Sequence, residues 1–365
     1  MHTVRIKLKS NPYNVLVGSD IVGSLGSYLK KLGLGEAAYI ITNRRVKYYH
    51  GKSIADSLKR RGFDFKFKAL PDSETSKSLK IASMVIKGLT AYARNKRVFV
   101  IAMGGGVVGD LAGFVASVYK RGVSYIQFPT TLLAQADSSI GGKTGVDLAE
   151  GKNLVGTFYQ PRLVCCDAAF LKTLSKKQIK NGLAEIIKCA IIKDKKLFVY
   201  LERNSRHVLS LNPSHLEHIL LSAITVKAKI VEADEREEKG LRTALNFGHT
   251  IGHAIEAAGK YRLYSHGEAV ALGMLTATNI SGRLGFITPD IKNRIRALLK
   301  VYGLPERAGE VSLRDIIAKH YHDKKFNGPR NRFVLISGIG KTKVVENIPL
   351  ALIKKAIQET IYPAP

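Results

Sequence analysis

Cysteine is scarce in this chain, and its placement excludes a disulfide-stabilised scaffold. Among 365 residues there are three cysteines, Cys165, Cys166 and Cys189, and none belongs to a CxxC pair. Two of them are sequence neighbours on a predicted strand, which is not the spacing of a disulfide framework. We therefore expect reduced thiols and a cytoplasmic location.

A long apolar segment of the kind that targets or spans membranes is also missing. The first ten residues alternate polar and apolar side chains, which is typical of an edge strand and provides no apolar leader. The stretch 98–119 is apolar enough to imitate a membrane helix, but it contains Asp110 and five glycines. Those residues suit a buried strand, turn and helix, so we expect no membrane association.

Acidic residues are few, 29 against 58 lysines and arginines, and the formal net charge is +29. Such an excess raises the hypothesis of nucleic-acid binding. The lysines occur as pairs spread along the chain, for example Lys30–Lys31 and Lys195–Lys196, and not as one basic block. Zinc-finger spacing and RNA-recognition signatures are absent from the sequence. A lysine-rich solvated surface is the simpler explanation, and we expect no nucleic-acid partner.

The rest of the composition, 45% hydrophobic and 24% charged, is that of a globular protein long enough for two domains. Short β-branched runs alternate with helical patterns in the first half, which predicts a parallel sheet covered by helices. Beyond about Leu171 the patterns are longer and helical. The sequence thus predicts an α/β domain at 1–172 and a mostly helical domain at 173–365, packed closely with a cleft between them. The predicted strands are 37–42, 63–69, 97–103, 124–128 and 162–166, and the predicted helices are 53–61, 78–94, 176–201, 213–233, 250–258, 267–284 and 291–302.

A glycine-rich turn follows the predicted strand 97–103. Gly104, Gly106 and Gly109 have the spacing GxGxxG, which lets a backbone approach a pyrophosphate at the start of a helix. However, the turn lies on a later strand than the first, and no acidic residue follows about twenty positions downstream. From these residues alone, a dinucleotide site and a plain strand-to-helix turn both remain open.

Reactive side chains are concentrated in the next segment. Two hydroxyls, Thr130 and Thr131, follow a predicted strand, and then Asp137 and Lys143 flank Gly141–Gly142. Lys152 and Asn153 complete this cluster. Lysines beside glycine turns are typical phosphate contacts, whereas the alternative is an ordinary solvent loop. So many reactive residues in a short span favour phosphate binding.

Three histidines form the most informative pattern in the second half. His249 and His253 are four residues apart and share one face of a predicted helix. His266 follows in a Ser-His-Gly turn that opens another helix. Clustered imidazoles of this kind bind borderline divalent metals such as zinc. The alternative is that His253 is a packed core residue and His266 a helix cap, and the spacing leaves both open.

Glu185 and Lys188 lie three residues apart among apolar neighbours on a predicted helix. The pair is either a surface ion pair or a buried glutamate, which would need a metal or a cation beside it. Together with two histidines, Glu185 would complete an open catalytic zinc site.

These segments together resemble the 3-dehydroquinate synthase family. The resemblance covers most of the chain, from Pro71 to Lys325, and its motifs stand in the order of the family. It implies a Rossmann-like NAD-binding domain, a helical metal-binding domain and a cytoplasmic homodimer. The motifs are 71–77, 104–110, 119–122, 128–147, 152–161, 182–188, 234–237, 245–256 and 265–268.

The resemblance also implies roles for individual residues. Zn2+ or Co2+ would be held by Glu185, His249 and His266, whereas His253 would act in catalysis and not as a ligand. The contacts to NAD would come from Asp72, Ser73, Glu74, Thr75, Ser76, Lys77, Gly106, Val107, Val108, Gly109, Asp110, Thr130, Thr131, Lys143, Lys152, Phe170, Leu171, Lys172 and Thr173. The catalytic and substrate contacts would come from Arg121, Asp137, Lys143, Asn153, Lys188, Lys227, Arg242, Asn246 and His253, with either Lys324 or Lys325 also reaching the substrate. Asn43 departs from an ideal adenosine site, because an amide bonds one ribose hydroxyl where a carboxylate would take two.

The activity implied is that of a lyase in the shikimate pathway of aromatic amino-acid biosynthesis. It would convert the sugar-acid phosphate 3-deoxy-D-arabino-heptulosonate 7-phosphate to 3-dehydroquinate and phosphate, regenerating NAD in each turnover. The nearest alternative is another sugar-phosphate cyclase, such as a 2-deoxy-scyllo-inosose synthase, whose substrate lacks a carboxylate. Arg121, Arg242, Asn246 and His253 together favour the synthase. A metal-dependent alcohol dehydrogenase would release NADH, and the phosphate-binding lysines count against it.

Overall fold

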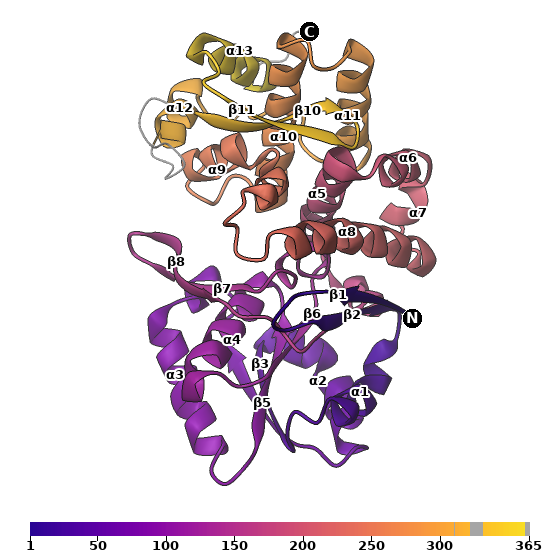
Figure 1. The fold of residues 1–365 in the computed structure, drawn as a ribbon, viewed down its shortest axis with the longest axis vertical. Coiled ribbons are helices and arrows are strands. Elements are labelled where there is room, and N and C mark those ends of the chain that lie inside the picture. The colour runs from indigo at the N-terminus through magenta and orange to yellow at the C-terminus, as the bar shows by residue number, and fades with distance from the viewer. Residues whose placement is uncertain (310, 322–330, 362–365) are drawn as a thin grey trace. The chain divides into compact units, whose positions relative to one another are not determined.

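The chain divides into two compact units in the computed structural model, which describes residues 1–309, 311–321 and 331–361 (Figure 1). Unit 1 comprises Met1–Ser175 with Leu216–Ala228, and unit 2 comprises Lys176–His215 with Lys229–Pro365. The predicted division into 1–172 and 173–365 stays a prediction of domain organisation. Lys324 and Lys325 lie outside the described residues.

The core of unit 1 is a seven-stranded sheet in the order β1-β2-β9-β6-β5-β3-β4. The β1–β2 pair is antiparallel, and the other neighbours in this sheet pair in parallel. The strands are β1 (His2–Ile6), β2 (Tyr13–Gly18), β3 (Ala37–Asn43), β4 (Asp64–Leu70), β5 (Val98–Gly104), β6 (Tyr125–Pro129) and β9 (Leu163–Asp167).

Helices cover both faces of this sheet (Figure 1). On one face, Ile54 of α2 (Arg44–Lys59) and Leu25 of α1 (Leu25–Leu32) join a cluster with Ile40. On the other, α3 (Leu79–Tyr92) and α4 (Gly106–Val118) pack against alternate residues of β3 and β5, such as Ile41 and Val100. Parallel strands that are buried on both faces are continuously apolar, which is why the sequence pattern predicted these strands.

The five predicted strands are confirmed to within one residue at each end. The predicted helix 53–61 begins earlier, at Arg44, because the Asn43 side chain caps it by accepting a hydrogen bond from the Val46 N–H at 2.7 Å. The expected edge strand at the start of the chain is β1. The prediction did not include α1, β2, or the antiparallel hairpin β7 (Lys143–Leu148) with β8 (Gly151–Phe158).

The strand order creates a topological switch point. From β3 the chain passes through α2 to β4 on one side, whereas from β5 it passes through α4 to β6 on the other. Connections that diverge in this way leave a crevice at the carboxyl ends of the strands, where open α/β sheets bind ligands. Asn43, Gly104 and Pro129 end their strands at this edge.

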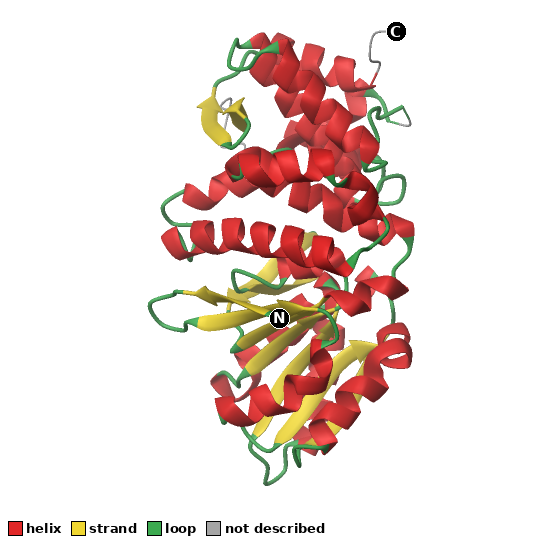
Figure 2. Ribbon diagram, turned by 90° about the vertical axis from the view of Figure 1, so that its right-hand side faces the viewer, coloured by secondary structure: helices red, strands yellow, loops and turns green. Residues whose placement is uncertain are grey.

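Unit 2 is mainly helical and contains one small hairpin (Figure 2). The predicted helix 176–201 is two helices, because Asp194 caps the second by accepting from the Leu197 N–H at 2.9 Å. The predicted helices 213–233, 250–258, 267–284 and 291–302 are confirmed within two residues, whereas α12, α13 and the hairpin were not predicted. Among the described residues, no helix is long and apolar enough to cross a membrane. The helices that lie wholly or partly in unit 2 are α5 (Lys176–Lys193), α6 (Lys195–Arg203), α7 (Ser205–Leu209), α8 (Pro213–Ala233), α9 (His249–Ala258), α10 (His266–Arg283), α11 (Pro289–Val301), α12 (Leu313–Tyr321) and α13 (Leu350–Ile361), and the hairpin strands are β10 (Arg332–Gly338) and β11 (Lys341–Glu346).

Candidate active site

The glycine turn brings bare backbone to the switch point of unit 1. Gly104 ends β5, Gly105 is the N-cap of α4, and Gly106 is its first residue. A Cβ at Gly104 would lie 2.7 Å from the Val108 side chain, and one at Gly106 would lie 3.2 Å from the Ser138 hydroxyl. A side chain at Gly104 would therefore clash and one at Gly106 would be tight, and the first N–H groups of α4 remain available for a phosphate. The predicted strand, turn and helix are confirmed.

Lys77 joins three of the predicted cofactor and substrate segments of unit 1. Its buried ammonium donates to the Asp110 carboxylate at 2.5 Å and to the side-chain oxygen of Asn153. Asn153 has a φ of +56° and its N–H donates to the Asp147 carboxylate at 2.8 Å. Burial raises the pKa of Asp110, although the charge of Lys77 opposes this shift. The three segments therefore meet around one cation.

The structure shows two internal bonds of Asn43. Its oxygen caps α2, and its amide nitrogen donates to the Asp72 carboxylate at 2.8 Å. One amide N–H remains for a ribose hydroxyl, so that contact stays a prediction. The carboxylate at this end of the sheet is Asp72, just beyond β4.

The other predicted cofactor residues of unit 1 differ in whether their side chains are hydrogen-bonded, buried or exposed. The Thr130 N–H donates to the Gly104 carbonyl at 2.9 Å, and the Thr131 hydroxyl accepts from the Ala134 N–H at 3.2 Å. Phe170 and Leu171 are buried in the helical turn η5 (Ala168–Thr173), with the Phe170 ring stacked on His50 at 4.0 Å. Neither side chain is open to a cofactor, so that segment offers backbone atoms and exposed Lys172.

Asp137 and Lys227 form a second ion pair in unit 1. Lys227, on α8, donates to the Asp137 carboxylate at 2.6 Å and to its carbonyl oxygen at 2.7 Å. Asp137 lies in a π-helical turn, η4 (Ala134–Ser138), a local geometry that is frequent at functional sites. The pair joins two predicted substrate residues that are far apart in sequence.

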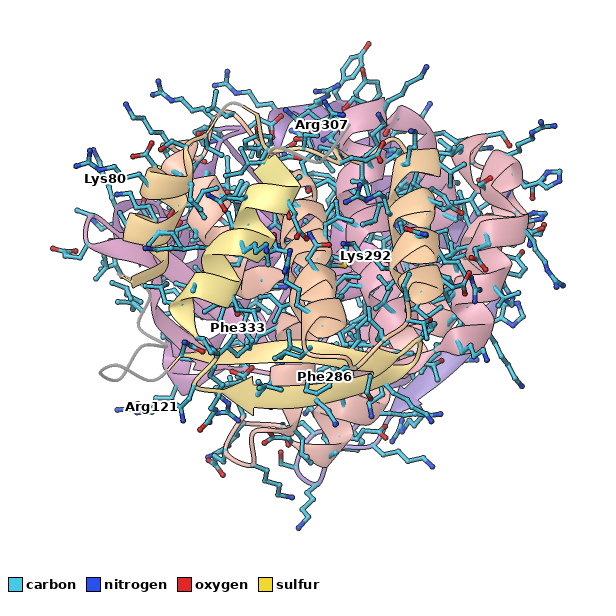
Figure 3. The ribbon with its side chains drawn as sticks, turned by 90° about the horizontal axis from the view of Figure 1, so that it is seen from above. Lys80, Arg121, Phe286, Lys292, Arg307 and Phe333 are labelled. Carbon is cyan, nitrogen blue, oxygen red and sulfur yellow. The ribbon has the colours of Figure 1, made fainter. Side chains whose placement is uncertain are left out.

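Arg121 is not brought into this cluster. It lies in the turn η3 (Tyr119–Arg121) with a φ of +63°, and its side chain is exposed (Figure 3). Within the described part of the chain, no hydrogen bond or ion pair links it to Lys227, Asp137 or Asn153. Lys143 is also exposed, at the start of β7.

In unit 2, glycines allow α9 and α10 to pack in close contact. Gly248, the N-cap of α9, has a φ of +79°, and a Cβ there would lie 2.6 Å from Met274. A Cβ at Gly273 would lie 1.8 Å from the Gly248 carbonyl oxygen. This approach leaves the His249 and His266 rings 5.5 Å apart. The glycines of the Gly-His-Thr-x-Gly-His segment thus have a packing role.

Glu185 of α5 completes a group with the two histidines. Its Oε1 lies 3.6 Å from His249 Nε2 and 3.3 Å from His266 Nε2, and one ligand atom from each residue lies within 4.8 Å of the others. Both carboxylate oxygens are buried without a hydrogen bond of good geometry among the described residues. Such oxygens facing two imidazoles are the donor set of a zinc-like ion, so the residues fit one.

The electrostatics of this group agree with that fit. The Lys188 ammonium contacts Glu185, and the two side chains are 2% and 1% exposed, so the surface-pair alternative is wrong. Burial opposes ionisation of Glu185, but Lys188 and the histidines hold its pKa well below its usual range. Burial and Lys188 lower the pKa of His249, which favours the neutral ring that binds metals. Burial also opposes charge on His266, yet Glu185 and Glu256 raise its pKa to about 10.

The structure also tests the alternatives for His253 and His266. His253 is exposed, with its ring 5.3 Å from that of His249, so it is not a packed core residue. Ser265 caps α10 in a capping box with Glu268, and His266 is the first helical residue, so it is not the cap. His253, Glu256 and His266 form a second group with ligand atoms within 4.8 Å.

Asp234 stands in the motif 234–237, but the sequence reasoning gave it no role. Its carboxylate accepts from the backbone N–H groups of Lys239 at 3.1 Å, Leu241 at 2.9 Å and Arg242 at 3.3 Å. These bonds outweigh burial and lower the pKa of Asp234. They fix the turn η6 (Leu241–Asn246), in which buried Arg242 donates to the Glu235 carbonyl at 2.7 Å. A carboxylate just after a long helix was the available signal.

Comparison with known proteins matches most of the chain to one family. A family model described as 3-dehydroquinate synthase N-terminal matches residues 67–181, and one described as 3-dehydroquinate synthase C-terminal matches residues 182–326. The chain is 44% identical to the 3-dehydroquinate synthase of Thermoanaerobacter pseudethanolicus over 344 residues, 94% of this chain and 96% of that protein. With the 3-dehydroquinate synthase of Desulforamulus reducens it shares 41% over 349 residues, 95% and 97% of the two chains.

Solved structures share the same fold. A 2-deoxy-scyllo-inosose synthase complexed with carbaglucose-6-phosphate, NAD+ and Co2+ matches with a TM-score of 0.87 and 28% identity, over 98% of this chain and 100% of that one. The 2-epi-5-epi-valiolone synthase of Streptomyces hygroscopicus subsp. jinggangensis, with NAD+ and Zn2+ bound, matches with a TM-score of 0.87 and 28% identity, over 97% and 98%.

The two cyclase structures are thus less similar in sequence than the 3-dehydroquinate synthases, so the cyclase alternative is not the better supported one. An iron-containing alcohol dehydrogenase, at a TM-score of 0.68 and 15% identity, shares the fold alone. With both family models matched and relatives above 40% identity over nearly the full length, this chain is an enzyme that belongs to the 3-dehydroquinate synthase family.

Proposed function

We propose that this enzyme converts 3-deoxy-D-arabino-heptulosonate 7-phosphate to 3-dehydroquinate and phosphate, as a lyase of the shikimate pathway in aromatic amino-acid biosynthesis. The observation that carries the proposal is the buried Glu185 carboxylate, which faces His249 and His266 in a chain whose long relatives are 3-dehydroquinate synthases. Net redox change is absent from this reaction, so NAD is needed in catalytic amounts only.

Glu185, His249 and His266 are proposed to hold Zn2+ or Co2+. A bound divalent ion lowers the pKa of a coordinated hydroxyl and so prepares it for oxidation. The protein's part is to supply three ligands and leave positions open for substrate oxygens. The buried Lys188 ammonium keeps Glu185 ionised, and exposed His253 would exchange a proton with the substrate at its ring nitrogen.

The switch point of unit 1 is proposed to bind NAD, which supplies the hydride acceptor of the reaction. The first N–H groups of α4, at Gly106–Val108, would face the pyrophosphate, with Gly109 and Asp110 beside them, since the Gly109 N–H already donates to the Gly105 carbonyl. Asp72 is placed to accept from ribose hydroxyls, and the Lys77 ammonium fixes Asp110 and Asn153 beside the turn. The further contacts proposed are Ser73, Glu74, Thr75, Ser76, Thr130, Thr131, Lys143, Lys152 and 170–173.

Charge-assisted bonds are proposed to hold the substrate, which carries a carboxylate and a phosphate. In unit 2 the contacts would come from Lys188, Arg242 and Asn246, and in unit 1 from Asp137, Lys143, Asn153 and Lys227. The Asp137–Lys227 pair and the Asp234-fixed turn at Arg242 support preorganised positions. Arg121, exposed on its turn, remains in the proposal on the family resemblance alone.

We also propose that the enzyme is a homodimer and is located in the cytoplasm. The homodimer is proposed on the family resemblance. Leu154 and Phe158 of β8, which are 38% and 44% exposed, and Met84 of α3, which is 40% exposed, are candidate contact residues. The cysteines are buried and form no disulfide with one another among the described residues, which supports a reduced, cytoplasmic setting. Light scattering of the purified protein tests the dimer.

The function is tested by measuring phosphate release from heptulosonate phosphate with NAD at trace concentration. We expect many turnovers per NAD and no accumulation of NADH. Absorbance of NADH that rises in proportion to product would contradict the proposal and favour a dehydrogenase. Turnover of a hexose phosphate without a carboxylate, in place of the heptulosonate, would favour the other cyclases.

A further inference from the structure

We propose that Glu256 is a positioning residue for the metal centre: it holds the Nδ1–H group of His266 and so presents Nε2 of that ring to the ion. This inference rests on the metal site of the proposed function. It assigns a role to a carboxylate that belongs to neither the ligand set nor the proposed substrate contacts.

The His266 ring lies between two carboxylates. Its Nε2 is 3.3 Å from Glu185 Oε1, and its Nδ1 is 3.3 Å from Glu256 Oε2. A neutral imidazole carries one N–H group, which stays at the nitrogen that has an acceptor. With Glu256 at Nδ1, the lone pair of Nε2 points toward Glu185 and His249. Carboxylates that act in this way on metal-binding histidines set both ring orientation and basicity.

The other ligand histidine is oriented differently. The Nδ1 of His249 lies 3.2 Å from the backbone carbonyl oxygen of Phe247, so its Nε2 also faces Glu185. Both ligand rings therefore use Nδ1 for orientation and Nε2 for the ion. The difference is that the support of His249 is backbone, whereas the support of His266 is a side chain that a substitution removes.

The packing of α9 on α10 puts Glu256 in this place. His249, His253 and Glu256 stand at positions i, i+4 and i+7 of α9, so they share one helical face. At Gly252 a Cβ would lie 3.0 Å from the Ala269 carbonyl oxygen, which shows how close α10 comes to this face. Glu256 is 12% exposed, so its charge acts on His266 with little screening.

A competing explanation is that His253, Glu256 and His266 hold a second cation, since their ligand atoms lie within 4.8 Å. That site would need His266 Nδ1 as a ligand, and one ring would then bridge two ions with no N–H group left. The hydrogen bond to Glu256 and the second ion are mutually exclusive, so stoichiometry distinguishes them.

The test compares Glu256→Gln with Glu268→Gln in the full chain. Glu268 accepts from the N–H and hydroxyl of Ser265 at 2.8 and 2.7 Å, so it also supports the start of α10 but does not contact the His266 ring in the described structure. Metal-stripped proteins are titrated with Co2+ against a chelator, and their melting temperatures are recorded. We expect Co2+ affinity to fall about 10-fold or more in Glu256→Gln, toward about 100-fold in Glu256→Ala. For Glu268→Gln we expect a change in Co2+ affinity within about 2-fold and a melting temperature close to that of the wild type, because glutamine keeps an oxygen that accepts from Ser265 in the capping box.

Three results would overturn the inference. Equal loss of affinity in both variants, or collapse of the metal-free fold in Glu256→Gln alone, would assign Glu256 a structural role. Binding of two Co2+ ions by the wild type, with loss of the second alone in Glu256→Gln, would assign it to a second cation site. Failure of the wild type to bind any Co2+ would instead reject the metal site itself, which keeps the two proposals separable.

Discussion

The two candidate groups, the metal group of unit 2 and the proposed nucleotide-binding edge of unit 1, are built by different means. In unit 2 the candidate metal group combines the almost fully buried Glu185 and Lys188 of α5 with the half-buried rings of His249 on α9 and His266 on α10. In unit 1 the nucleotide-binding edge consists of strand ends, a bare glycine turn and a helix N-terminus, with side chains that are mostly half-buried or exposed. A buried charged group depends on every member, whereas an edge of backbone distributes binding over many contacts. Single substitutions are therefore expected to act more severely in unit 2.

The largest effect is expected for Glu185→Ala. It removes a metal ligand and the carboxylate that faces the buried Lys188 ammonium, so the free energy of unfolding should fall by about 3–5 kcal/mol. Denaturant unfolding and metal analysis of the purified protein measure both effects. As a control, Glu185→Leu with Lys188→Met should recover most of the stability and still bind no metal. Wild-type stability in Glu185→Ala would show that the pair is not buried as described.

The next effect concerns the contact between α9 and α10. A methyl group at Gly273 would lie 1.8 Å from the Gly248 carbonyl, so Gly273→Ala should cost about 1–3 kcal/mol or more and weaken metal binding. Gly282 is the matched control on the same helix, because a Cβ there meets no atom within 4 Å. Gly282→Ala should stabilise the helix by about 0.5–1 kcal/mol. Equal stability of the two variants would refute the packing role.

Metal affinity should rise with pH. Glu185 and Glu256 raise the pKa of His266 to about 10, so an ion that binds its Nε2 displaces a proton at neutral pH. Between pH 6 and 9 the metal affinity is expected to increase about tenfold per pH unit. His249 should release no further proton, because its pKa is lowered and its ring is already neutral. The same raised pKa affects the metal-stripped protein: the stability contributed by His266 should decline as pH rises from about 6.5 to about 10. Calorimetry in two buffers measures the released proton, and zero release would contradict the assignment.

A smaller effect is expected in unit 1. Lys77→Met removes the cation that fixes Asp110 and Asn153, and NAD should bind about tenfold more weakly, in line with about 1.5 kcal/mol for a hydrogen bond to a charged group. Metal content should stay at one ion per chain. Lys80→Met, which removes an exposed lysine of α3, is the control and should leave NAD affinity unchanged (Figure 3). Loss of metal in Lys77→Met would show that the two candidate groups are not independent.

The same contrast explains how much the sequence could predict. The strands of unit 1 were predicted because burial on both faces makes each one continuously apolar, as in β3 and β5. The β7–β8 hairpin was missed because its pairing depends on close backbone contact: a Cβ at Gly156 would lie 2.2 Å from the Thr144 carbonyl. The break at Asp194 was missed because a single cap interrupts an otherwise helical pattern.

For the candidate site, residue spacing predicted which side chains share one helix, but not which side chains on different helices face each other. The pattern His249–His253 placed two rings on one helix, but nothing local says that Glu185 faces His249, since the two lie on different helices. That placement came from the family resemblance. The role proposed for Glu256 was not visible either, because its partner His266 reaches it only through the packing of α9 on α10.

The central claim is that Glu185, His249 and His266 bind one zinc-like ion while His253 serves catalysis. It is tested most directly by elemental analysis of two matched variants, His249→Ala and His253→Ala. We expect no bound metal and no turnover in His249→Ala, since a ligand is lost. In His253→Ala we expect one ion per chain and slow turnover, because an exposed imidazole is removed from proton exchange. Full metal retention in His249→Ala, or loss of the metal in His253→Ala alone, would contradict the account.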